Sequence, residues 1–272
     1  MDILDQPRPD DKLCSAVHAG SLLNIQQAIQ ELEEAGSPVT LSRAIVTSIS
    51  IRNIDVLRLL LSYGDVDEEV AEAAATSESI QFVQVILNHG WSINRNLRRG
   101  LIPSVLRQRS LAIRNGNFLD ELLSLGADPN AESNLGETAL SFAIREGTMK
   151  VIRRLLGAGT DVSRGDLLHC ASRRESSKDT YELIVMLIQK GVAVDSYQWE
   201  NEKAKMMRYG YPQGTALHIA CKEGNFPAAQ ALLEYGADPR RLKKRCGSLV
   251  PPSPFDVTTP HSPMRSLLER HM

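Results

Sequence analysis

Six short segments of the chain end in glycine and repeat one apolar spacing. In each segment, apolar residues lie seven, four and three positions before the glycine. This spacing places three side chains on one stripe of a helix, and glycine readily adopts the left-handed conformation that ends many helices. The six glycines are Gly64, Gly90, Gly126, Gly159, Gly191 and Gly236. The pattern therefore predicts a short amphipathic helix that recurs along the chain and stops in the same way each time.

The intervals between these glycines indicate a repeat protein. A weaker seventh copy of the pattern ends at Gly36, and successive glycines are then 26 to 45 residues apart. Before the amphipathic helix, several units contain a shorter segment with alanine and a final glycine, as in residues 112–116, 143–147 and 220–224. Periods of this size are typical of solenoids, in which each unit is too small to bury its apolar face alone. We therefore predict an all-α solenoid of about seven helix-turn-helix units.

The segment GTALHIACKEGNFPAAQALLEYGADPR, residues 214–240, resembles an ankyrin repeat. Repeats of that family begin with a TPLH-like motif, continue with an alanine-rich first helix and close with LLxxGAdpN. Residues 136–163 and 166–171 resemble the same repeat less completely. The positions that match the family's motif are Thr138, Leu140, Leu168, His169, Thr215, Leu217, His218 and Gly224. The irregular spacing is similar to that of the divergent ankyrin proteins of filamentous fungi.

The resemblance implies an organisation for the whole chain. It implies an all-α ankyrin-repeat solenoid of about seven units and a truncated C-terminal cap, with short β-hairpin-like turns between units. We expect an N-terminal tail at residues 1–10 and a solenoid at residues 11–272. Within the solenoid we expect degenerate repeats at 11–110, clearer repeats at 111–240, an insertion at 196–213 and the cap at 250–272.

Two histidine–cysteine pairs raise the alternative of a zinc or thiol enzyme: His169 with Cys170, and His218 with Cys221. A structural zinc site needs four converging ligands, usually from paired short spacings, and these residues occur one pair per repeat. The family resemblance instead implies that Thr215 caps its helix and bonds the His218 ring. The chain also has no GxSxG, phosphate-loop, HExxH or Rossmann motif. We therefore expect no catalytic residue, no metal ligand and no cofactor.

Charge and cysteine usage restrict the cellular environment and the partners. The start of the chain has no basic and apolar signal-peptide pattern, and no apolar run approaches the roughly 20 residues that span a bilayer. The four cysteines form no close pair, which favours a reducing compartment. A net charge of -2 and the lack of a recognisable reading helix argue against direct nucleic-acid binding. We expect a cytoplasmic or nuclear protein that binds another protein, with no small-molecule substrate and no membrane.

The largest departure from the repeat pattern is the insertion at residues 196–213. It holds Tyr197, Trp199, Tyr209 and Tyr211, four of the chain's 13 aromatic residues, together with two methionines. Aromatic and methionine side chains are frequent anchors of protein interfaces. Two interpretations stay open: the aromatic residues contact a partner, or the insertion folds back and buries them.

Two basic features suggest further contacts. Arg107 and Arg114 lie seven residues apart, on one face of an expected helix, where they suit an acidic or phosphorylated partner. The alternative is an ordinary solvated face. A second cluster consists of Arg240, Arg241, Lys243, Lys244 and Arg245. It suits a nuclear-import signal, which would make the protein a nuclear regulatory cofactor, or a contact with an anion.

The preferred function is non-catalytic recognition of another protein, as a scaffold or adaptor. Solenoids of this kind bind through a concave face made of the turn tips and the exposed sides of the first helices. Fold alone does not identify the partner.

Overall fold

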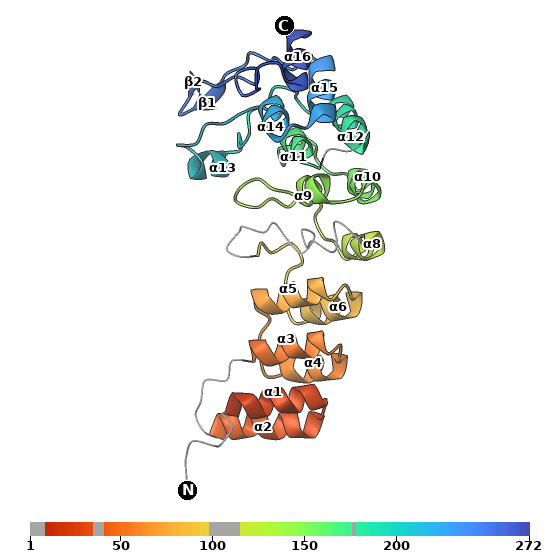
Figure 1. The fold of residues 1–272 in the computed structure, drawn as a ribbon. Helices are drawn as coiled ribbons and strands as arrows, with labels where there is room; N and C mark the ends of the chain where they lie inside the picture. The colour runs from red at the N-terminus through yellow and green to blue at the C-terminus, as the bar shows by residue number, and fades with distance from the viewer. Residues whose placement is uncertain (1–8, 35–40, 98–114, 176–177) are drawn as a thin grey trace. The chain divides into compact units, whose positions relative to one another are not determined.

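The computed structural model describes residues 9–34, 41–97, 115–175 and 178–272. Contacts divide the chain into two compact units, Met1–Arg95 and Asn96–Met272, which are described separately. In the described residues, the regular secondary structure is helical apart from two three-residue strands (Figure 1). The predicted all-α class is therefore confirmed. No helix among the described residues is both long and apolar enough to cross a membrane.

The first unit consists of three helix pairs. Each pair buries an apolar stripe, and in the third pair Ala71, Ala74 and Ala75 of the first helix are fully buried, so that the helices approach closely. The pairs are α1 (Pro9–Ala19) with α2 (Leu22–Glu34), α3 (Ser42–Ser50) with α4 (Ile54–Leu61), and α5 (Glu68–Thr76) with α6 (Ile80–Asn88).

The second unit continues the same design and adds two further elements. Its repeat helices are α8 (Gly116–Ser124), α9 (Ala139–Glu146), α10 (Met149–Gly157), α11 (Leu167–Ser172), α12 (Lys178–Gln189), α14 (Ala216–Glu223), α15 (Phe226–Glu234) and α16 (Pro263–Glu269). First helices pack on first helices, α9 on α11 and α11 on α14, while α12 packs on α15 and α15 on α16. The additions are the short helix α13 (Glu202–Met207) and an antiparallel hairpin of β1 (Lys243–Arg245) and β2 (Ser248–Val250).

The repeated apolar stripe forms the core of both units. In all six copies, the residues seven and four positions before the glycine are buried. Five of the six glycines have φ between +81° and +95°, as a left-handed helix stop requires. The prediction is wrong at Gly64, whose φ lies outside that region; a Cβ there would lie 3.0 Å from the Leu41 side chain, so close packing explains this glycine.

A second difference concerns Gly116. The sequence pattern places it at the end of a first helix, but it is the first residue of α8. The side chain of Asn115 accepts a hydrogen bond of 3.0 Å from the backbone N–H of Phe118, and this cap starts the helix there. At Gly224 the pattern is correct, because this residue ends α14 with φ +67°.

Candidate functional site

The start of the insertion is held against the body of the second unit by Tyr197. This side chain is buried, and its hydroxyl donates a hydrogen bond of 3.0 Å to the carbonyl of Leu242. The guanidinium of Arg241 lies 5.1 Å from the centre of the Tyr197 ring, and the ammonium of Lys244 lies 5.7 Å from it. Tyr197 therefore joins the insertion to the basic segment 240–245, and it is not available as an exposed partner contact.

The next anchor joins Trp199 to Asp166. The backbone N–H of Trp199 donates a hydrogen bond of 2.9 Å to Oδ2 of Asp166. Both residues have positive φ, +62° for Trp199 and +50° for Asp166. This conformation costs energy for residues other than glycine. Burial raises the pKa of the Asp166 carboxyl to about 6, although the Trp199 hydrogen bond opposes this shift.

Helix α13 is fixed by Asn201. Its side-chain oxygen accepts a hydrogen bond of 2.8 Å from the backbone N–H of Ala204, which caps the helix, and its Nδ2 donates to the carbonyl of Leu135 at 3.5 Å. Gly136 makes this approach possible, because a Cβ at that position would overlap the Asn201 amide. Ala204 is fully buried on the inner face of the helix. The insertion is thus docked on the turn that precedes α9.

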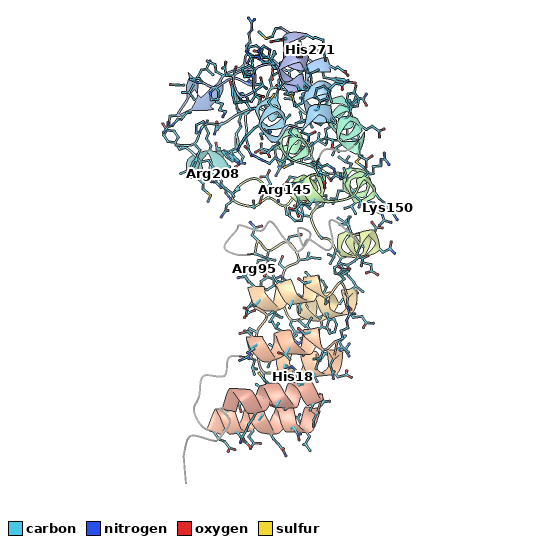
Figure 2. The ribbon with its side chains drawn as sticks, in the orientation of Figure 1. His18, Arg95, Arg145, Lys150, Arg208 and His271 are labelled. Atoms are coloured by element: carbon cyan, nitrogen blue, oxygen red, sulfur yellow. The ribbon has the colours of Figure 1, made fainter. Side chains whose placement is uncertain are left out.

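The outer part of the insertion is exposed. The exposed fraction is 82% for Met206, 53% for Met207, 62% for Tyr209 and 58% for Tyr211. Arg208 follows Met207 in the chain and lies beside α13 (Figure 2). Its guanidinium is 5.2 Å from the ring centre of Trp199 and 5.6 Å from the ring centre of Tyr211. The arginine therefore links the half-buried tryptophan to the exposed tyrosine.

The hairpin extends this exposed region. The return strand of the insertion pairs with β1, since Gln213 and Lys244 exchange two backbone hydrogen bonds of 2.7 and 2.8 Å. At the hairpin tip, the thiol of Cys246 donates to the carbonyl of Tyr209 at 3.3 Å. Leu249 on β2 is 63% exposed. We call the set Met206, Met207, Tyr209, Tyr211 and Leu249 the insertion–hairpin surface.

The insertion–hairpin surface lies on one side of the second unit. Helix α13 and the β1–β2 hairpin project away from α12 and α15 (Figure 1). Residues 196–213 and 240–250 together carry eight basic and two acidic side chains. Apolar and aromatic groups with a basic surround are suited to hold an acidic protein segment.

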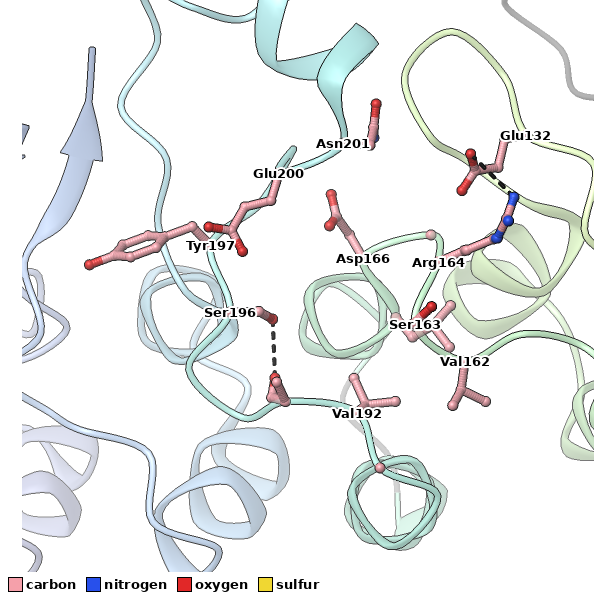
Figure 3. A pocket seen from close by; sticks show the side chains of 14 residues that line it. Glu132, Val162, Ser163, Arg164, Asp166, Val192, Ser196, Tyr197, Glu200 and Asn201 are labelled. Carbon is pink, nitrogen blue, oxygen red and sulfur yellow. Dashed lines mark hydrogen bonds and ion pairs between the residues drawn. The ribbon is translucent and has the colours of Figure 1, made fainter. Parts of the chain in front are cut away.

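A cavity of about 410 Å³ lies between the insertion and the turn before α11 (Figure 3). Its lining includes the carboxylates of Glu132, Asp166 and Glu200, and Arg164 pairs with Glu132 at 3.7 Å. The described lining contains neither histidine nor cysteine. The insertion forms one wall of the cavity, through Ser196, Tyr197, Glu200 and Asn201.

The two histidines of the repeat motif, His169 and His218, connect neighbouring repeats. The backbone N–H of Thr215 donates to Nδ1 of His218 at 3.0 Å, so this nitrogen accepts and the proton is on Nε2. Nε2 then donates to the carbonyl of Pro252 at 3.1 Å, and Nε2 of His169 donates in the same way to Gly214 at 3.1 Å. Burial lowers the pKa of both rings to about 4.

The thiols beside these histidines are buried. Burial raises the pKa of Cys170 and of Cys221 to about 12, so both thiols are protonated at neutral pH and neither is an activated nucleophile. No three His, Cys, Asp or Glu side chains in the described ranges are grouped in a way that could hold a metal ion.

The other expected site residues have varied positions. Arg107 and Arg114 lie outside the described residues. In the earlier repeat, Thr138 and Ser141 form a reciprocal cap, with Ser141 Oγ accepting from the Thr138 N–H at 2.8 Å. Leu140, Leu168 and Leu217 are buried. The basic residues 240–245 lie in and before strand β1, where the sequence gives no expectation of a strand.

Comparison with known proteins identifies the repeats. Residues 110–198 match the sequence model of three ankyrin repeats, and residues 213–241 match that of a single ankyrin repeat. The chain contains ankyrin repeats. Ankyrin repeats are generally protein–protein interaction modules and are typically non-catalytic. Most of the insertion falls between the two matched segments, which marks it as an addition to the ankyrin pattern.

The curated relatives match this chain over only a small part of their own length. The chain is 29% identical over 201 residues to the E3 ubiquitin-protein ligase KEG of Arabidopsis thaliana, covering 68% of this chain and 12% of the relative. It is 29% identical over 134 residues to the transient receptor potential channel pyrexia of Drosophila melanogaster, covering 47% and 12%. The human ASB11 ankyrin repeat domain has the same fold, with a TM-score of 0.54, 17% identity, and coverage of 96% of this chain and 97% of that one.

Proposed function

We propose that this protein is a non-catalytic scaffold or adaptor that binds a partner protein through the insertion–hairpin surface. The observation that carries the proposal is the exposure of Met206, Met207, Tyr209 and Tyr211 within six residues. Large exposed apolar groups gathered on one surface mark an interaction site, and aromatic residues dominate the energy of many interfaces.

The manner in which the insertion is held supports this proposal. Tyr197, Trp199 and Asn201 fix its base by hydrogen bonds to Leu242, Asp166 and Leu135. The exposed residues therefore project from an ordered support. A pre-ordered surface loses less conformational entropy when a partner binds.

The test compares two serine variants of the full chain. The first replaces Met206, Met207, Tyr209 and Tyr211. The second replaces Leu22, Leu23 and Tyr63, which are exposed apolar residues of the first unit, with exposed fractions of 44%, 64% and 48%. Affinity purification from the native cell, followed by quantitative mass spectrometry, compares their partners with those of the wild type.

We expect the first variant to lose its main partner and the second to keep it. Equal recovery with all three proteins would overturn the proposal. Circular dichroism checks that both variants keep the helical content of the wild type, so that loss of binding is not loss of folding.

The import-signal hypothesis for residues 240–245 stays a prediction, as does a cytoplasmic or nuclear location. In the structure two of its basic residues, Arg241 and Lys244, contact the Tyr197 ring. Fusing the hexapeptide to a fluorescent reporter, and separately placing Ala at the same positions of the full chain, tests it. A reporter that stays in the cytoplasm, together with an alanine variant that is distributed like the wild type, would exclude this role.

A further inference from the structure

The geometry of the hairpin determines where the backbone of β2 points. Cys246 and Gly247 form the two-residue turn between the strands, and both have positive φ, +50° and +84°, as a type I′ turn requires. Residue pairs in an antiparallel hairpin alternate between hydrogen-bonded and non-hydrogen-bonded. The backbone of Lys244 bonds outward to Gln213, so the pair Lys244–Leu249 is of the non-hydrogen-bonded kind.

It follows that the backbone N–H and C=O of Leu249 point away from β1. No backbone hydrogen bond of Leu249 outside the hairpin is found in the described part of the chain. The order across this small sheet is therefore Gln213, β1, β2 and then an open edge with Leu249 at its centre. An open edge of this kind is a template for a further strand.

The residues around this edge are basic and therefore favour an acidic partner. Residues 240–250 contain five basic side chains and no acidic one. No ion pair involves any of the five among the described residues, in contrast to arginines elsewhere in the unit such as Arg145 and Arg164. Lys243 and Arg245 lie on one face of the hairpin, and Leu249 lies on the other, because side chains alternate along a strand.

We propose that an extended acidic segment of a partner protein adds as a strand along the open edge of β2. The partner's backbone pairs with the N–H and C=O of Leu249. Its acidic side chains lie on the face of Lys243 and Arg245, and an apolar side chain between them lies on the face of Leu249. This inference rests on the proposed protein-binding function and specifies the chemistry of the partner.

The open edge of β2 is short, so backbone pairing contributes only a modest part of the binding energy of a partner strand. Pro251 and Pro252 follow β2 and have no N–H to donate, so a partner strand pairs only around Leu249. Charge and the adjacent exposed Tyr209 and Tyr211 then supply the remaining binding energy. The preference for an acidic sequence is accordingly expected to weaken as the salt concentration rises.

The test uses a random 12-residue peptide library displayed on phage, with the full chain as bait. One bait carries Leu249→Pro, which removes the outward N–H, and its matched control carries Leu249→Ala, which shortens the side chain but keeps the N–H. Since the N–H of Leu249 makes no bond inside the hairpin, the proline variant retains the hairpin's own hydrogen bonds. A third bait carries Lys243→Glu and Arg245→Glu.

We expect the wild type to enrich peptides in which acidic and apolar residues alternate. The dissociation constant of a synthetic copy of such a peptide is expected to increase about tenfold for Leu249→Pro, and by less than about threefold for Leu249→Ala. The double glutamate variant is expected to enrich basic peptides instead. This third bait keeps the test decisive if the proline variant fails to fold.

Several outcomes would overturn the inference. They are enrichment of no peptide, enrichment without acidic bias, equal binding by the proline and alanine variants, and unchanged selection by the double glutamate variant. Sedimentation that shows a wild-type dimer lost in Leu249→Pro would mean that a second copy occupies the edge, which also contradicts it. None of these results affects the serine-variant test of partner capture, so the failure of this inference and of the proposed function are distinguishable.

Discussion

Asn201 packs directly on Gly136, 65 positions earlier in the chain, and this contact fixes helix α13 on the turn before α9. The same asparagine caps α13 through the N–H of Ala204. One side chain thus both starts the helix and docks it. The position of Met206 and Met207 on the surface depends on a glycine in another repeat.

Replacing Gly136 with alanine is expected to undock the insertion. The new Cβ overlaps the Asn201 amide, and φ of +74° is unfavourable for alanine. The matched control is Gly126→Ala, where φ is +87° but nothing lies within 4 Å of the new Cβ. We expect Gly136→Ala to lower the free energy of unfolding by about 1–3 kcal/mol more than Gly126→Ala, the usual range for overpacking.

Urea unfolding followed by Trp199 fluorescence measures this difference. Trp91→Phe in all the proteins leaves Trp199 as the single tryptophan, since the chain has two. Equal effects of the two alanine substitutions would show that the contact between Gly136 and Asn201 does not hold the insertion.

Asp166 is expected to destabilise the second unit at neutral pH. Burial raises its folded pKa to about 6, above the value of about 3.9 in an unfolded chain. A raised carboxyl pKa contributes stability that is fully present below about pH 3.9 and is lost as the pH rises through 6. The stability of Asp166→Asn, which does not titrate, is therefore expected to gain roughly 2–3 kcal/mol relative to the wild type between pH 4 and pH 7.

Urea unfolding of both proteins at several pH values measures this change. A stability difference between wild type and Asp166→Asn that stays constant from pH 4 to pH 7 would contradict the account of this carboxyl. Asparagine retains an oxygen that can accept the Trp199 N–H, so the comparison isolates the charge.

His218 is expected to have the opposite pH dependence. Its folded pKa is lowered to about 4 by burial, below the unfolded value of about 6.5. The contribution of the neutral His218 ring to the stability of the fold is therefore present above about pH 6.5 and is lost as the pH falls toward 4. The matched variant is His218→Ser, because Ser141 accepts the threonine N–H at the equivalent position of an earlier repeat.

We expect His218→Ser to be less stable than the wild type by about 1–2 kcal/mol at pH 7, because it loses the hydrogen bond to Pro252. This deficit is expected to shrink at pH 5, where the histidine itself becomes costly. Thermal unfolding at both pH values measures the deficit, and a deficit that grows at pH 5 would exclude a buried neutral ring.

The hairpin turn offers a stabilising substitution. Cys246 has φ of +50° at the first central position of a type I′ turn, where asparagine is favoured. Cys246→Asn is expected to raise the free energy of unfolding by about 0.5–1 kcal/mol, and Cys246→Val to lower it, since β-branched residues disfavour positive φ. Both variants lose the thiol contact with Tyr209, so equal effects in urea unfolding would argue against this turn geometry.

The repeat helices could be predicted from the sequence because their signal is local. An apolar spacing of three and four residues before a glycine predicts both the buried stripe and the helix end. The expected role of the glycine was wrong at two positions. Gly64 packs against Leu41, which lies 23 positions earlier. Gly116 begins α8 because Asn115 caps that helix.

The insertion could be located from the sequence, but its two faces could not be separated. Tyr197 is buried and Tyr209 is exposed, and no periodicity in the sequence distinguishes them. The residues that hold the base of the insertion, Leu242, Asp166 and Leu135, are 33 or more positions away from the residues they bind. The β1–β2 hairpin could not be predicted for a different reason. The dipeptide Cys246–Gly247 is a weak turn signal, and each of the two strands is only three residues long.

The central claim is that the insertion–hairpin surface binds the partner. The most direct test is the dissociation constant of the purified partner for the variant with serine at Met206, Met207, Tyr209 and Tyr211, and for the control with serine at Leu22, Leu23 and Tyr63. We predict at least a roughly 100-fold increase for the surface variant, equivalent to about 2.8 kcal/mol, and a change of less than about twofold for the control. Similar dissociation constants for the wild type and the surface variant would contradict the account.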